Sequence, residues 1–158
     1  MRVGGMEYRY GARDRPADAW LLLDQGRFSG GVYLAGRAVE GMLRSLIWHS
    51  DHEYATGKKS LGTGHNLREL LSLACNLEAL RQSVDFQKIQ TDVQTISRLW
   101  WNNLRFRPDS KLSAQWYSIG VVGKRRSLKA ASREFYGACS TIIKRCEVIW
   151  DAHQRLRK

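Results

Sequence analysis

The stretch YLAGRAVEGMLRSLIWH, residues 33–49, decides the fold that the sequence predicts. Apolar side chains recur every three or four residues, which is the period of one face of an α-helix. With the preceding valine they form one stripe: Val32, Ala35, Val39, Met42, Leu43, Leu46 and Ile47. The spacing predicts a long helix that buries one side, so the charged residues within it need a separate explanation.

Periodicity predicts a helix on either side of this stretch and two more toward the C-terminus. The first begins near Pro16, a favourable first-turn residue, and ends before Gly26. A helix opens within HNLRELLSLACNL at residues 65–77, and a last, long one runs from residue 128 to residue 153.

The remaining helix steps through residues 86–100 by threes and fours. We expect Pro108 to end it, because the residue before a proline is pushed out of helical geometry. Residues 112–123 are predicted as a short extended piece or a loose turn. The sum is an all-α antiparallel bundle of about five helices, a single domain over residues 1–158 with its core at about 17–150.

Composition favours a cytoplasmic protein. No run of about 18 uncharged apolar residues exists, so no membrane span is predicted. The first 15 residues lack the apolar core of a secretion signal. Cys75, Cys139 and Cys146 have no disulfide or metal-binding spacing, and no cofactor is expected.

The net charge of +11 is unevenly distributed. Residues 1–97 hold 12 Lys and Arg against 11 Asp and Glu, whereas residues 98–158 hold 14 against 4. A localised positive field favours a polyanion, above all nucleic acid, although basic residues also simply solvate helix faces. The cluster GKRRSLKAASR supplies three of the binding candidates: Lys124, Arg125 and Arg126.

Two polar clusters are further candidates for binding. Arg37, Glu40 and Arg44 form a strip beside the apolar stripe, where the Glu40–Arg44 pair contributes about 0.2–0.5 kcal/mol if exposed. In RLWWNNLRFRPD, residues 98–109, Arg105 and Arg107 alternate with aromatic residues, as in proteins that bind single-stranded RNA. These arginines either bind a ligand or cap the helix, whereas Trp100 continues the core stripe.

Histidines offer little catalytic or metal-binding chemistry. Cys139, Cys146 and His153 are spaced by seven residues, about 10.5 Å along a helix, which is too far for one metal ion. His49 follows Arg44 by five residues, so the two side chains point about 140° apart on a helix. We therefore predict no metal site and no active site built from Arg44 and His49.

Three elements in order resemble the HEPN domain, the higher-eukaryote and prokaryote nucleotide-binding fold: YLAGRAVEGMLRSLI, then GHNLRELL, then LRFRPD. The resemblance implies a helical bundle in which Glu40 and Arg44 match the acid–base pair of helix two. It also implies that His65 matches the histidine before the next helix, and that Glu40 and Arg44 lie in a groove near Arg105 and Arg107. The arginine–histidine motif of the ribonuclease members is missing near Arg105.

These features favour a binding module that engages RNA or nucleotide or docks a partner. The resemblance implies a homodimer and a minimal nucleotidyltransferase as partner, in a toxin–antitoxin pair. A metal-independent ribonuclease is an alternative, with His65, Arg44 or His49 as its weak catalytic candidates. A structural oligomerisation bundle is another. The sequence leaves open whether the chain is an enzyme.

Overall fold

The computed structural model describes residues 4–60, 62 and 64–156, and its regular elements in this part of the chain are helices joined by turns and loops. Residues 1–3, 61, 63, 157 and 158 lie outside the described residues. The elements are α1 (Gly5–Asp24), α2 (Phe28–Ser50), α3 (His52–Ala55), α4 (Leu67–Ala74), α5 (Glu78–Arg81), α6 (Phe86–Leu99), the 3-10 helix η1 (Asn102–Phe106), α7 (Asp109–Ser118) and α8 (Leu128–Leu156).

The all-α prediction is confirmed for the described residues, which contain eight α-helices and no strand. The expected count of about five was too low. Helices α3 and α5 have four residues each, too short to display a helical period, and α7 falls where an extended piece or a loose turn was predicted. None of the helices in the described ranges is both long and apolar enough to cross a membrane.

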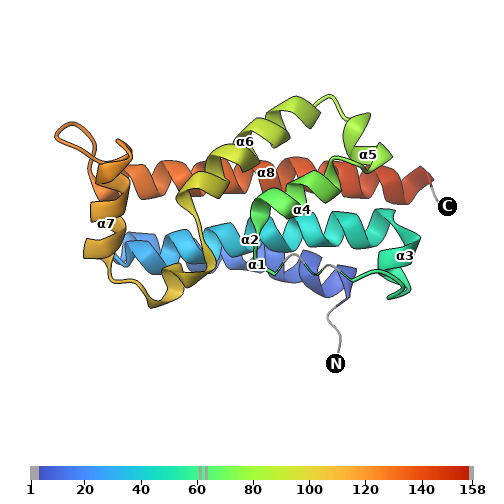
Figure 1. Cartoon of the computed structure of the whole chain (residues 1–158), viewed down its shortest axis with the longest axis horizontal. Helices are drawn as coiled ribbons and strands as arrows, with labels where there is room; N and C mark the ends of the chain where they lie inside the picture. Colours follow the sequence, from blue (N-terminus) through green and yellow to red (C-terminus); the bar gives the residue numbers. More distant parts are fainter. Residues whose placement is uncertain (1–3, 61, 63, 157–158) are drawn as a thin grey trace.

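Three long helices, α1, α2 and α8, lie side by side along the length of the molecule (Figure 1). Helix α1 is antiparallel to α8, because Arg9 near its start pairs with Asp151 and Asp24 at its end pairs with Arg133. It is also antiparallel to α2, to which a tight turn at Gly26 joins it. Helices α2 and α8 therefore run in the same direction, a parallel pair that the predicted antiparallel bundle did not include.

The predicted stripe of α2 forms the centre of the core, with all seven of its apolar residues at most 1% exposed. Helices α4 and α6 cross one side of the long helices and add their own apolar faces (Figure 1). Glycines let neighbours come close to α2: a Cβ at Gly31 would collide with Leu23, and one at Gly36 would collide with the indole of Trp100. Trp100 is buried, as predicted.

Helix α1 begins at Gly5, eleven residues before the predicted start, and Pro16 lies inside it. A proline within a helix removes one backbone hydrogen bond, so the local rule favours a start at that residue. Tertiary contacts hold the preceding turns in place. Ala12 is fully buried, and Arg9 reaches Asp151 of α8 at 2.7 Å.

Pro108 does not end the helix of residues 86–100, because α6 already ends at Leu99. It instead precedes α7, whose first residue, Asp109, binds the start of α2. The Asp109 carboxylate accepts hydrogen bonds from the backbone N–H groups of Phe28 at 3.1 Å and Ser29 at 2.6 Å. These are first-turn donors without partners inside the helix, and a negative charge is favourable there.

Candidate nucleic-acid interface

The polar strip of α2 is buried around one carboxylate. Glu40 is only 2% exposed, and Arg44 Nε donates to its Oε1 at 2.8 Å. Arg37, one turn earlier, donates to the other carboxylate oxygen. The strip thus does not face water, the ordinary position for such a pair. Glu40 instead holds two arginines of its own helix.

The loop before α4 closes over this cluster. His65 Nδ1 lies 3.0 Å from Glu40 Oε1 and within hydrogen-bonding distance of Arg37, and Arg44 donates to the carbonyl of Gly64. The His65 side chain remains 40% exposed. Glu40 and His65, 25 residues apart, therefore meet in one network that ties the loop to α2. No contact joins Glu40 to Arg105 or Arg107 within the described residues.

His49 and Arg44 have different neighbours. The His49 ring stacks on Trp150 of α8 with centroids 4.1 Å apart, and His153 lies edge-on at 5.2 Å. Arg44 is engaged with Glu40 and lies over the ring of Tyr8. The described residues contain no group of three His, Cys, Asp or Glu side chains that could hold a metal ion.

Arg105 and Arg107 differ from the arginines of α2 in exposure and in charge partners. Both are exposed, and in the described part of the chain neither forms an ion pair or a side-chain hydrogen bond. The Arg105 guanidinium lies 4.6 Å from the ring centre of Phe106, which is itself 74% exposed. An exposed aromatic face flanked by free cations offers both stacking and charge to a ligand.

The α7–α8 loop brings further cations to the same end of the molecule. Figure 1 places η1, α7 and this loop together at one end of the long axis. Lys124 and Arg125 are exposed and have no partner among the described residues, whereas Arg126 pairs with Glu134. We call this surface the basic end: Arg105, Phe106, Arg107, Lys111, Tyr117, Lys124 and Arg125.

Little negative charge offsets the basic end. Residues 98–127 contain seven Lys and Arg but a single acid, Asp109, and that carboxylate is taken up by the N–H groups of α2. Asp109 was not a sequence candidate. Its position directly after a proline is a weak signal for a helix start, but its partners are 80 residues away and could not be anticipated.

Two cysteine thiols are buried in the core. Burial raises the pKa of Cys146 to about 12 and that of Cys139 well above its usual value, so both stay protonated. Both belong to the core, whereas His153, which follows them at the same spacing, is only half-buried. These groups take no part in the candidate interface.

Comparison of the chain with family models, curated proteins and solved structures found no match.

Proposed function

We propose that the chain is an RNA-binding module of HEPN type and that its basic end carries the interface. One observation carries the proposal: exposed cations without acidic partners among the described residues lie at the same end of the bundle as an exposed phenylalanine, whose ring Arg105 contacts. Arginine and lysine bind phosphates through charge, and aromatic faces stack on the unpaired bases of single strands. Each nucleotide of single-stranded RNA carries both a phosphate and an unpaired base.

We infer that the module works together with a second protein. The resemblance to the HEPN domain supports a homodimer and a minimal nucleotidyltransferase as partner protein, in a toxin–antitoxin pair. In that setting, the basic end binds RNA while other faces of the bundle contact protein.

Salt dependence of RNA binding tests the proposal. Fluorescence anisotropy with a labelled single-stranded RNA should show binding at low ionic strength that weakens as salt rises. The variant Arg105→Ala/Arg107→Ala should lower the slope of log K against log salt by about 1.4, since each phosphate contact to a single strand contributes about 0.7. Absence of binding at low salt would refute the proposal.

A matched control removes the same charge elsewhere. Lys58 and Arg81 are exposed, have no partner among the described residues, and lie near α3 and on α5, toward the other end of the bundle (Figure 1). Lys58→Ala/Arg81→Ala should leave most of the affinity and the slope in place. An equal loss in both double variants would show that only net charge matters, and the basic end would not be the interface.

A metal-independent ribonuclease is the second candidate, favoured by the contact between Glu40 and His65. A carboxylate that orients a histidine is a common arrangement for general-base catalysis, and all described contacts of His65 use Nδ1. The ribose 2′-hydroxyl would give its proton to Nε2 and attack the neighbouring phosphorus. The bond from phosphorus to the 5′-oxygen would then break, and that oxygen would leave with the proton returned by the histidine.

Cleavage assays separate the two candidates. The ribonuclease predicts chelator-resistant cleavage of RNA that His65→Ala abolishes and His49→Ala spares. Binding without cleavage supports the RNA-binding module alone. Cleavage that survives His65→Ala would exclude the Glu40–His65 pair as its source.

A further inference from the structure

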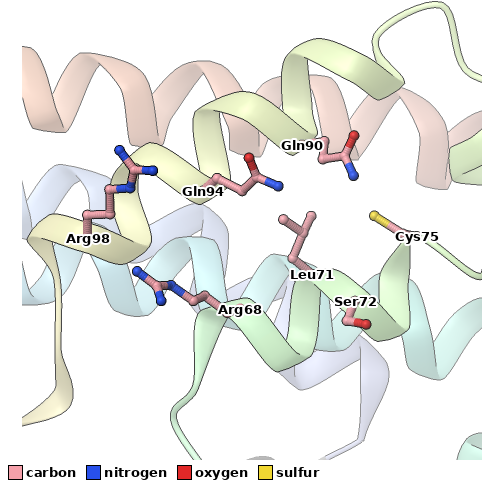
Figure 2. Close-up of a pocket in the computed structure, with 7 residues that line it drawn as sticks. All are labelled: Arg68, Leu71, Ser72, Cys75, Gln90, Gln94 and Arg98. Atoms are coloured by element: carbon pink, nitrogen blue, oxygen red, sulfur yellow. The ribbon is translucent and has the colours of Figure 1, made fainter.

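A groove of about 460 Å³ lies between α4 and α6, apart from the Glu40 network and from the residues that define the basic end (Figure 2). Its α6 wall is a single face, because Gln90, Gln94 and Arg98 follow one another at intervals of four residues. The apolar residues of α6 point to the other side, into the core. The volume is within the range of small-ligand sites, about 300–1,000 Å³.

The α4 wall presents its own face to the same space. Arg68 lies at one end, Leu71 in the middle and Cys75 at the other end (Figure 2). Arg68 and Arg98, one from each helix, share the same end of the groove. Leu71 provides an apolar surface between the arginines and the thiol.

The arginine end is built for an anion. Arg68 Nε donates to Ser97 Oγ at 3.2 Å, which directs its guanidinium along α6 and leaves its other donors available. Arg98 has no ion pair or hydrogen bond among the described residues, and no carboxylate lines the groove. Two guanidinium groups without a counter-charge match a phosphate, which accepts paired N–H donors.

The rest of the groove is polar but uncharged. The carboxamides of Gln90 and Gln94 can each donate and accept hydrogen bonds, and such groups pair with the amino group and ring nitrogen of adenine. A nucleotide presents a phosphate, an apolar sugar and base face, and a hydrogen-bonding edge in that order. The groove presents two arginines, Leu71 and two carboxamides to match them.

We propose that the α4–α6 groove binds one nucleotide, with its phosphate on Arg68 and Arg98 and its base edge on Gln90 and Gln94. The nucleotide is either free or one unit of an RNA strand, and only the second case rests on the RNA-binding function proposed above. Arg98 is near the end of α6, from which the chain continues directly to η1 and the basic end (Figure 1). A strand can therefore pass from the groove to Arg105 and Arg107.

The thiol of Cys75 can report whether a ligand occupies the groove. It is half-buried, whereas Cys139 and Cys146 are buried in the core, so it is the thiol that a reagent reaches first in the folded protein. Partial burial raises the pKa of Cys75, so labelling is best followed at mildly alkaline pH. A ligand in the groove covers this thiol and slows its labelling.

The experiment measures the labelling rate of Cys75 in the full chain with adenosine monophosphate, inorganic phosphate, single-stranded oligoadenylate or an oligoglutamate peptide. A nucleotide at ten times its dissociation constant should slow labelling about tenfold, because the rate follows the free fraction. Inorganic phosphate should protect less. Protection by adenosine monophosphate alone indicates a free-nucleotide site, and protection by oligoadenylate as well places a strand in the groove.

Variants identify the groups responsible. Arg98→Ala and Gln94→Ala, both on the exposed side of α6, should remove the protection by adenosine monophosphate, whereas Lys58→Ala, outside both the groove and the basic end, should leave it unchanged. Protection that persists in Arg98→Ala would overturn the proposal. Equal protection by oligoglutamate would overturn it too, because the groove would then bind acidic protein segments.

The two proposals fail separately. If neither nucleotide nor oligoadenylate slows labelling but RNA still binds through Arg105 and Arg107, the groove proposal is overturned and the RNA-binding function stands. If adenosine monophosphate protects Cys75 but no RNA binds at low salt, the groove stands as a nucleotide site and the function proposed for the basic end is refuted.

Discussion

Two pairs of arginines in this chain show how burial decides what a charge does. Buried Arg44 and half-buried Arg37 share the buried carboxylate of Glu40, which His65 also contacts. Arg105 and Arg107 are exposed beside Phe106, without an acidic partner in the described part of the chain. The first pair stabilises the fold, whereas the N–H donors of the second pair are available to a ligand. The sequence spacing of the arginines does not distinguish these roles, but the position of the nearest carboxylate does.

Removing the shared carboxylate should have the largest effect. Glu40→Gln leaves the guanidinium of Arg44 buried without a counter-charge, which costs about 3–5 kcal/mol when one partner of a buried pair is lost. Urea unfolding measures this change in the free energy of unfolding. Glu69→Gln, an exposed glutamate of α4, should change it by less than about 0.5 kcal/mol.

Replacing both Glu40 and Arg44 with apolar residues tests whether the unpaired charge causes the loss of stability. Glu40→Leu/Arg44→Met should recover much of the stability that Glu40→Gln loses, because no charge then remains unpaired. A loss below about 1 kcal/mol in Glu40→Gln would contradict the view that the network is committed to the fold.

The exposed aromatic residue should affect binding and leave stability unchanged. Phe106→Ala is expected to weaken RNA binding by about 5- to 150-fold, the effect of losing one stacked base at about 1–3 kcal/mol. The midpoint of thermal unfolding should stay the same, because the ring is exposed. Tyr10→Ala, an exposed aromatic residue of α1, serves as the control in anisotropy titrations. A drop in stability without a change in affinity would assign Phe106 to the fold.

The smallest effect is expected at Asp109, the single acid of residues 98–127. Asp109→Ala removes hydrogen bonds to Phe28 and Ser29 and should lower the free energy of unfolding by about 0.5–2 kcal/mol. RNA affinity should stay equal or rise slightly, since a negative charge is lost from the interface. Weaker RNA binding in a fully folded variant would mean that Asp109 organises the basic end.

The sequence predicted the parts of the fold that depend on local period. All seven stripe residues of α2 are buried, and Ile89, Val93 and Ile96 of α6 lie in the core as their spacing indicated. Helix ends were less predictable, because they depend on distant residues. Pro16 is accommodated within α1 by contacts with α8, and α6 ends well before Pro108.

For the candidate sites, the sequence predicted which residues take part but not how those residues are arranged. Glu40, His65, Arg105 and Arg107 could be named in advance, but the joining of Glu40 to His65 depends on how the loop before α4 closes. The α4–α6 groove left no sequence signal at all. Glutamines spaced by four are ordinary on an exposed helix face, and only the packing of α4 beside α6 sets them opposite Arg68.

The packing of Trp100 against Gly36 links α2 to the proposed RNA interface. The indole fits where α2 lacks a side chain, and its Nε1 donates to the carbonyl of Tyr33 at 3.0 Å. This anchor fixes the direction in which the chain leaves α6, and hence where Arg105 and Phe106 are displayed. A methyl group added at Gly36 would therefore reorient residues nearly seventy positions later in the chain. A substitution in the core can thus change ligand affinity without altering any residue that contacts the ligand.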